Sequence, residues 1–191
     1  QTVQAAVETN PDHIVLHIDS SNAFNAVDRG QVLGSVFNDD RLSSLWRVFR
    51  FTYGAPSPLL VRDRGCVVDY YPSTNGVKQG DVLASLGYSC AFQPALLAAV
   101  DGLPNVTARA IMDDLTLCGP VDEVFTAYDR YVASARALSV EVNPSKTVVQ
   151  IPRGDPSNEV LVAATLRRLK VVRGNWKLLG AQVGMDFAAM S

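Results

Sequence analysis

The stretch AIMDDLTL, residues 110–117, sets two adjacent aspartates between two short apolar segments. The segments, residues 107–112 and 115–118, favour strands, so the pattern predicts a β-hairpin with the carboxylates of Asp113 and Asp114 at its tip. Aspartate is also common in turns, and the pair by itself is explained as well by a polar β-turn. A catalytic role therefore depends on what the rest of the chain brings to this hairpin.

A second strand is expected at residues 13–19 (HIVLHID), which alternate apolar and polar positions and end on Asp19. Two carboxylate sites, one at a strand end and one at a hairpin tip, converge if the two strands are neighbours in one sheet. Phosphoryl transfer uses such a convergence, because two divalent cations about 4 Å apart take oxygen ligands from a few carboxylates.

The remaining elements follow from capping residues and breakers. Asp28 is the expected N-cap of a helix to Phe37, and Asp40 that of a helix that runs toward Tyr53 and stops at Gly54. The other expected elements are a hairpin of residues 59–62 and 66–71, helices 82–100 and 121–138, a strand 146–151, a helix that starts at Asp155-Pro156 and runs to about 169, and a strand 178–183.

The order of these elements includes a strand, helix, hairpin, helix and strand. It predicts an α+β fold, with helices packed on one face of an antiparallel sheet. The apolar runs are expected to be too short to cross a bilayer, and Gln1 begins a polar segment without a signal-peptide pattern. Three separated cysteines, without a Cys-x-x-Cys pair, indicate neither a disulfide framework nor a zinc site. We expect a soluble protein, or an excised fragment of one, from a reducing and therefore intracellular compartment.

Five segments extend the carboxylate pattern along most of the chain: IDSSNAFNAV (18–27), NGVKQGDVLASLGYS (75–89), AIMDDLTL (110–117), VNPSKT (142–147) and KLLGAQVG (177–184). In this order they resemble five successive palm motifs of reverse transcriptases, and they look most like those of non-long-terminal-repeat retroelements. One such motif is weak evidence, whereas five in the right order are strong. The resemblance implies a polymerase palm with a fingers remnant over residues 1–176, and a primer-grip hairpin followed by the start of a thumb over residues 177–191.

The resemblance assigns the metal ligands. It makes Asp19 the first ligand and Asp113 the second, with Asp114 assisting and the backbone carbonyl of Ser20 as a further ligand. The implied cofactor is a pair of Mg²⁺ or Mn²⁺ ions. Lys146 matches the lysine of the fourth motif, which binds the triphosphate or protonates pyrophosphate; without the family, a lysine at a strand edge that discourages aggregation explains it equally well.

Three further residues match nucleotide contacts of the family. Phe24 matches the aromatic residue beneath the incoming sugar that excludes a 2′-hydroxyl, although a Phe after a strand is more often a core residue. Gln79 matches the residue that contacts the incoming nucleotide and nearby template, and Gly80 allows close approach. The chain departs from the family at Ile111, where an aromatic residue is usual, and at Val82, where a proline is common.

The leading hypothesis is the core of an RNA-directed DNA polymerase. It would extend a DNA or RNA primer on an RNA template with deoxynucleoside triphosphates, with the missing fingers and thumb supplied by a larger polypeptide. The alternatives are a catalytically inactive, domesticated reverse-transcriptase-like domain that binds RNA or protein, and an RNA-directed RNA polymerase. The net charge of −2 argues against any function that requires binding to nucleic-acid phosphates. Phe24 favours a polymerase that uses deoxynucleotides over one that uses ribonucleotides. No membrane partner is expected, and a nuclear location would follow only for a retroelement protein.

Overall fold

The computed structural model describes residues 3–10, 12–174, 176–178 and 181–183. The chain divides into two compact units. Unit 1 comprises residues 1–21, 95–136 and 141–191, and unit 2 comprises residues 22–94 and 137–140. Each unit is described by itself.

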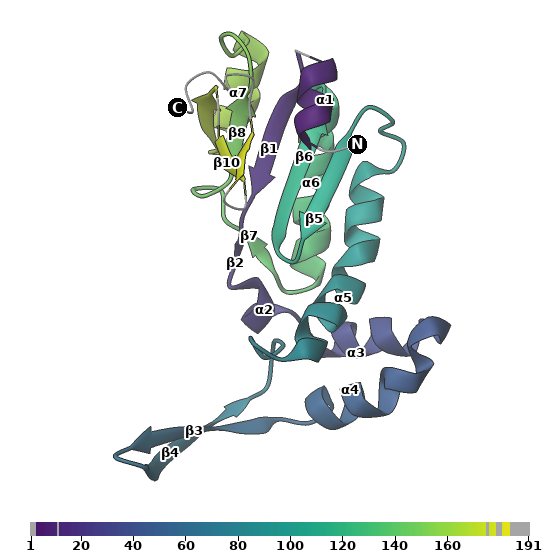
Figure 1. The fold of residues 1–191 in the computed structure, drawn as a ribbon, viewed down its shortest axis with the longest axis vertical. Helices are drawn as coiled ribbons and strands as arrows, with labels where there is room; N and C mark the ends of the chain where they lie inside the picture. The colour runs from purple at the N-terminus through teal and green to yellow at the C-terminus, as the bar shows by residue number, and fades with distance from the viewer. Residues whose placement is uncertain (1–2, 11, 175, 179–180, 184–191) are drawn as a thin grey trace. The chain divides into compact units, whose positions relative to one another are not determined.

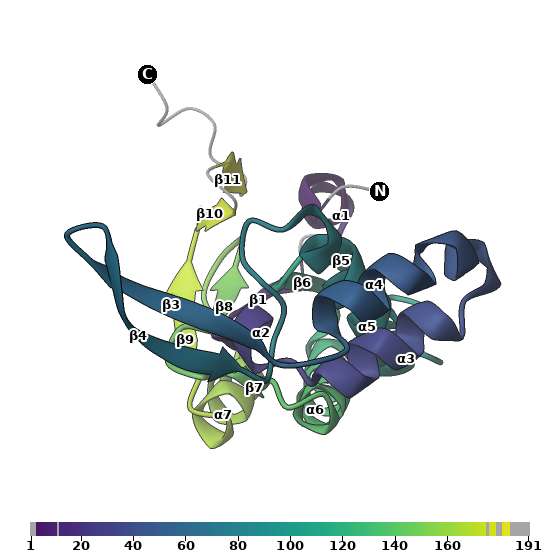
Figure 2. The same ribbon diagram turned by 90° about the horizontal axis from the view of Figure 1, so that it is seen from below.

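Unit 1 is built on a five-stranded sheet in the order β5-β6-β1-β8-β9. Its strands are β1 (Ile14–Ile18), β5 (Thr107–Ile111), β6 (Asp114–Gly119), β8 (Val148–Ile151) and β9 (Lys170–Arg173). Strand β1 pairs antiparallel with both β6 and β8, whereas β8 and β9 are parallel. Figure 2 shows α6 (Val121–Ala137) and α7 (Asn158–Leu166) on one side of these strands. The predicted α+β palm is confirmed, with β9 as a parallel addition at the edge.

The central strand is buried along its whole length. Leu16 and Leu117 are paired across β1 and β6 and are fully buried, as is Val149 on β8. Polar side chains in this sheet satisfy one another: the His17 ring nitrogens lie 3.4 Å from Thr116 Oγ1 and 3.1 Å from Gln150 Oε1. Burial lowers the pKa of His17, which favours the neutral ring in this network.

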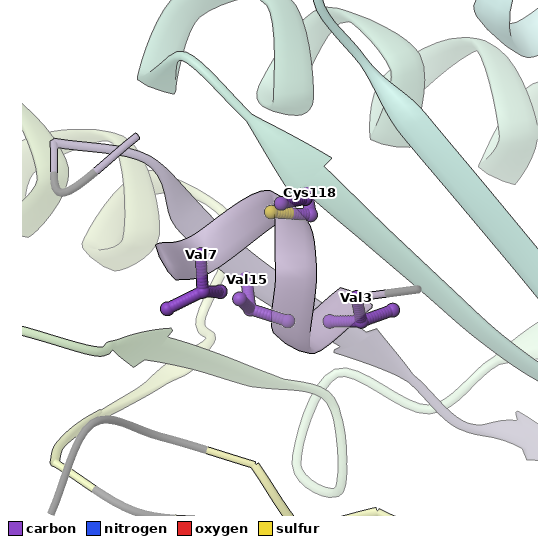
Figure 3. Close-up of a cluster of buried hydrophobic side chains, with 5 residues drawn as sticks. Val3, Val7, Val15 and Cys118 are labelled. Carbon is purple, nitrogen blue, oxygen red and sulfur yellow. The ribbon is translucent and has the colours of Figure 1, made fainter. Parts of the chain in front are cut away.

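A short N-terminal helix, α1 (Val3–Thr9), packs on the same sheet and was not predicted from the sequence. Its Val3, Ala6 and Val7 form a buried cluster with Val15 of β1 and Cys118 of β6 (Figure 3). In Figure 2, α1 lies on the opposite side of the sheet from α6 and α7. The burial of Cys118 raises its pKa to about 11, so this thiol acts as a small apolar core residue.

Unit 1 also contains two pairs of short strands outside the five-stranded sheet. Strands β2 (Ser20–Ser21) and β7 (Glu141–Val142) pair antiparallel, and so do β10 (Trp176–Leu178) and β11 (Ala181–Val183). The last pair agrees with the hairpin that the resemblance implies, whereas the single strand expected at residues 178–183 is wrong, since its two ends belong to different strands. The role of this hairpin as a primer grip and the boundary at residues 176/177 stay predictions, and residues 179–180 and 184–191 lie outside the described residues.

Unit 2 carries helices and one long β-hairpin (Figure 1). Its elements are α2 (Ala23–Ala26), α3 (Arg29–Phe37), the 3₁₀ helix η1 (Asp40–Leu45), α4 (Trp46–Tyr53), β3 (Ser57–Asp63), β4 (Cys66–Ser73) and most of α5 (Val82–Val100). Asp28 caps α3 by accepting a hydrogen bond from the Gln31 amide, as predicted. The predicted β3–β4 hairpin is also observed.

Several boundaries predicted from the sequence were wrong. Asp39, rather than Asp40, caps the segment that leads to Tyr53, and that segment begins as a 3₁₀ helix. Ser157, rather than Asp155, caps α7 through the Val160 amide, and α7 ends at Leu166. The strand expected from residue 146 begins at Val148, because residues 143–147 form a turn.

Helix α5 corrects the expectation that every apolar run is too short to cross a bilayer. By length and composition alone, this 19-residue helix could cross a membrane. However, 39% of its most apolar 18-residue stretch is buried inside the protein. The buried positions Ala84, Tyr88, Ala91, Ala95 and Ala99 recur at intervals of three to four residues. A buried stripe of this kind is typical of a helix that packs against a protein core.

Candidate functional site

The sheet register of unit 1 brings the predicted carboxylates to the same end of two neighbouring strands. Ile18 on β1 pairs with Leu115 on β6. Asp19 directly follows Ile18, and Asp114 directly precedes Leu115. The prediction that strand-end and hairpin carboxylates would converge on neighbouring strands is therefore supported by the pairing.

The β5–β6 hairpin differs from the prediction at its tip. Ile111 pairs with Asp114, so the two turn residues are Met112 and Asp113, and Asp114 is the first residue of β6. Met112 adopts a left-handed conformation with φ of 57°, which is uncommon for a residue of this size. The tight turn separates the two aspartates, with Asp113 in the turn and Asp114 on the strand.

The charges of Asp19 and Asp113 both act on the carboxyl group of Asp114. The pKa of Asp114 is raised by partial loss of solvent around its carboxyl group, and further by the negative charges of Asp113 and Asp19. Crowded carboxylates attract hard divalent cations, which prefer oxygen ligands. In the described part of the chain, no group of three or more His, Cys, Asp and Glu side chains is already arranged to hold a metal ion. Carboxylate oxygens are the donor chemistry that a hard cation such as Mg²⁺ takes.

A turn in the fourth motif is bonded directly to the backbone of Asp19. The backbone N–H of Asn143 donates to the backbone carbonyl of Asp19 at 2.8 Å. The backbone N–H of Asp19 donates to Thr147 Oγ1 at 3.3 Å. Asn143 in turn accepts from Ser145, and its carbonyl accepts from the fully buried Thr147. Lys146 is exposed on this turn, so the turn fixes the backbone of Lys146 relative to that of Asp19.

Ser20, the next predicted ligand, lies in β2 and is buried. Burial raises the pKa of Tyr131 on α6, and the nearby Ser20 side chain lowers it in part. The charge of Asp113 also raises the Tyr131 pKa. The raised pKa keeps Tyr131 protonated at neutral pH, and the sequence motifs gave no signal for this residue.

The predicted nucleotide residues Phe24, Gln79 and Gly80 belong to unit 2. The Phe24 ring stacks on Tyr88 of α5, with ring centroids 4.7 Å apart and planes 9° from parallel. Such stacking fixes the orientation of an aromatic ring. Phe24 is half-buried, so it is neither a simple core residue nor a free surface residue.

Gln79 and Gly80 lie in the segment that joins β4 to α5. The stretch from Ser73, the last residue of β4, to Asp81 is called here the 73–81 loop. Gln79 is exposed. Gly76 and Gly80 have φ of +70° and +85°, and a Cβ on Gly76 would come within 2.4 Å of the Asn25 carbonyl oxygen. Glycine is therefore required at position 76 by close backbone approach as well as by conformation.

The 73–81 loop is also hydrogen-bonded to the first motif. The Gly76 amide donates to the Val27 carbonyl at 2.9 Å, and the Val77 amide donates to the Phe24 carbonyl at 2.7 Å. The second motif is thus attached to the segment that carries Phe24. The structure brings Phe24, Gln79 and Gly80 together in unit 2, and Asp19, Ser20, Asp113, Asp114 and Lys146 together in unit 1.

The two departures from the family motifs are both exposed positions. Ile111, where an aromatic residue is usual, is 57% exposed beside Asp114. Val82, where a proline is common, is the exposed first residue of α5. Proline is favoured but not required at the first position of a helix, so neither change disturbs the backbone that carries the motifs.

Comparisons with known proteins agree with this fold. The chain is 30% identical over 138 residues to the retrotransposable element SLACS 132 kDa protein of Trypanosoma brucei gambiense, a match that covers 72% of the chain and 12% of that protein. The chain thus spans about an eighth of the length of this relative. No family model matches the sequence.

Two solved telomerase structures have a similar fold. Apo telomerase from Candida tropicalis, truncated from its C-terminal domain, has a TM-score of 0.65 and 12% identity over 95% of this chain and 36% of that chain. Telomerase from Candida albicans, in complex with a fragment of telomeric RNA, has a TM-score of 0.61 and 13% identity over 77% of this chain and 29% of that chain. At such identity the likeness concerns the fold.

Proposed function

We propose that this reverse-transcriptase-like palm is the catalytic core of an RNA-directed DNA polymerase. It would add deoxynucleotides to the 3′ end of a DNA or RNA primer. One observation carries the proposal: the Ile18–Leu115 pairing sets Asp19 beside the hairpin of Asp113 and Asp114, in a chain whose ordered motifs resemble those of reverse transcriptases. We further propose that the palm works within a longer polypeptide that supplies fingers and thumb segments.

In this proposal Asp19, Asp113 and Asp114 would hold two Mg²⁺ or Mn²⁺ ions, together with the Ser20 carbonyl. Bound there, the ions would activate the primer hydroxyl and neutralise charge on the leaving pyrophosphate. The proposal is supported by the negative charge that Asp113 and Asp19 already impose on Asp114. The cost of gathering these carboxylates is offset when they neutralise a cation.

Lys146 would bind the triphosphate or donate a proton to the departing pyrophosphate. Support comes from the bonds between the Asn143 turn and the Asp19 backbone, which give the Lys146 backbone a defined place beside the first metal ligand. An exposed ammonium on a long flexible chain can reach phosphate oxygens as they move. Lys146 would thus supply positive charge in a region that is otherwise acidic.

Phe24 and the 73–81 loop would select the incoming nucleotide. Stacking on Tyr88 holds the Phe24 ring in one orientation, as a steric block to a ribose 2′-hydroxyl requires. Gln79 would contact the nucleotide and nearby template from the loop that is bonded to the Phe24 carbonyl. This part of the proposal favours a DNA polymerase over an RNA-directed RNA polymerase.

A Phe24→Ala variant tests the proposed sugar selection. Removal of the ring is expected to reduce the preference for deoxynucleotides over ribonucleotides by about ten-fold or more, because specificity here comes from a clash with the 2′-hydroxyl. The preference is measured as the ratio of kcat/KM values in single-nucleotide incorporation. Phe37→Ala, at an exposed position on α3, is the control. An unchanged ratio in Phe24→Ala would remove Phe24 from this role.

Primer extension on an RNA template, with Mg²⁺ and deoxynucleoside triphosphates, tests the proposed function itself. The assay uses the chain together with the segments that flank it in its natural polypeptide, and RNA binding is measured in parallel. Extension is the expected result. RNA binding without extension would instead favour the non-catalytic scaffold, for which the net charge of −2 offers no electrostatic help.

A further inference from the structure

A buried arginine in unit 2 makes an unusual set of contacts. Arg29, the first residue of α3, is 7% exposed. Its Nε donates to the Gly76 carbonyl at 2.6 Å, and its two terminal nitrogens donate to the Ser73 carbonyl and the Ser73 hydroxyl, each at 2.7 Å. Every nitrogen of this guanidinium is thus used on one end of the 73–81 loop.

Tyr53 holds the other end of the same loop. This last residue of α4 is 2% exposed, and its hydroxyl donates to Asp81 Oδ2 at 2.5 Å and accepts from the Lys78 amide at 3.3 Å. Asp81 uses its second oxygen to accept from the Leu83 amide at the start of α5. Burial, and then the bond to Asp81, raise the pKa of Tyr53 to about 12, so its hydroxyl keeps the proton that it donates.

The two side chains form one unit. The Arg29 guanidinium carbon lies 5.7 Å from the centre of the Tyr53 ring, within the range of a cation–π contact. Together they contact residues 73, 76, 78 and 81 of the loop. The exposed Gln79 lies between the positions that they hold, and its own side chain takes no part in these contacts.

We infer that Arg29 and Tyr53 are positioning residues, which hold the 73–81 loop, and through it Gln79, in the arrangement that accepts the incoming nucleotide. A buried charge bonded to backbone carbonyls is costly unless its geometry is fixed. A loop that contains glycine does not by itself hold a nucleotide contact in place, since glycine leaves the backbone free to adopt many conformations. The Arg29 and Tyr53 contacts supply that fixed geometry. The inference rests on the proposed polymerase function for its consequence, but the hold on the loop is a property of the chain alone.

Tyr53→Phe separates this role from general stability, because it removes one hydroxyl and leaves the ring in place. Two measurements are needed. The first is hydrogen exchange of the Lys78 amide, without substrate, in the 191-residue chain; exchange is expected to accelerate about ten-fold as the amide loses its acceptor. The second is deoxynucleotide incorporation, in which KM is expected to rise by about ten-fold while kcat and the melting temperature change little.

Two further variants sharpen the test. Arg29→Lys keeps the charge but cannot serve three separate oxygens, and is expected to accelerate exchange at Gly76 and Val77 and to raise KM likewise. Tyr128→Phe, which removes a hydroxyl at another buried tyrosine, is expected to leave both measurements unchanged.

The outcomes separate the inference from the function on which it rests. Unchanged Lys78 exchange in Tyr53→Phe, or faster exchange with an unchanged KM, would overturn the inference. An equal fall in kcat and stability, without a rise in KM, would also overturn it, because it would indicate a merely structural role. A wild-type polypeptide that includes the flanking segments and still lacks activity would refute the polymerase proposal, while the exchange result would still establish the hold on the loop.

Discussion

An Asp19→Asn variant is expected to lose primer extension by roughly a thousand-fold or more, since a carboxylate that binds and neutralises the catalytic cations would be gone. The side chain keeps its size, and the sheet should be unaffected. Removal of one charge also relieves repulsion at Asp114, whose pKa is raised in part by Asp19. The melting temperature should therefore be unchanged or slightly higher, while activity is lost.

A loss of activity without a loss of stability distinguishes a metal ligand from a structural residue. A variant that simply unfolds loses both. Asp101→Asn removes a charge of the same kind at an exposed position in unit 1, and it should retain full activity. If Asp19→Asn extended primers within about ten-fold of the wild-type rate, Asp19 would not be a metal ligand.

Leu16→Ala is expected to be the most destabilising single truncation in the sheet, at about 3 kcal/mol in the free energy of unfolding. Leu16 is fully buried on the central strand and is paired with the fully buried Leu117. The substitution leaves a cavity that neighbouring strands cannot close without breaking their pairing. Urea denaturation measures the change.

The matched control for Leu16 is Leu161→Ala on α7. Leu161 is 42% exposed, so its truncation removes less buried apolar area. The free energy of unfolding should fall by about 1 kcal/mol or less. Equal losses for the two leucines would contradict the assignment of β1 as the centre of the core.

The sequence was most informative where local pattern and register agree. Alternating residues before Asp19 and the apolar segments around Asp113 and Asp114 each predicted a strand, and β1 and β6 do pair. Asp28 was identified as an N-cap because a carboxylate before a helix can accept the first free amides. These features could be predicted because they depend on residues that are close together in the sequence.

Other features depend on residues far apart in the chain. Arg29 contacts Ser73 and Gly76, and Tyr53 contacts Asp81; no local pattern signals these contacts. The Asn143-Pro144 dipeptide predicted the turn, but the hydrogen bond from the Asn143 backbone amide to the Asp19 carbonyl spans most of the chain and has no local signal. The parallel strand β9 was missed because a four-residue segment with only two apolar residues, KVVR, carries little periodicity.

The choice between two caps also shows where local reasoning ends. Asp155 and Ser157 both favour an N-cap, and only the second accepts from an α7 amide. A proline after Asp155 is compatible with a helix start, so local chemistry does not decide between the two residues, and the helix starts two residues later than predicted. Boundaries of this kind require the packed structure.

Mg²⁺-dependent extension of a primer on an RNA template, measured for the wild-type polypeptide beside its Asp113→Ala variant, tests the central claim most directly. The carboxylate site predicts that the wild type adds deoxynucleotides and that the variant, still folded and still able to bind the primer and template, does not. Extension that survives Asp113→Ala would contradict the assignment of these aspartates as the catalytic site.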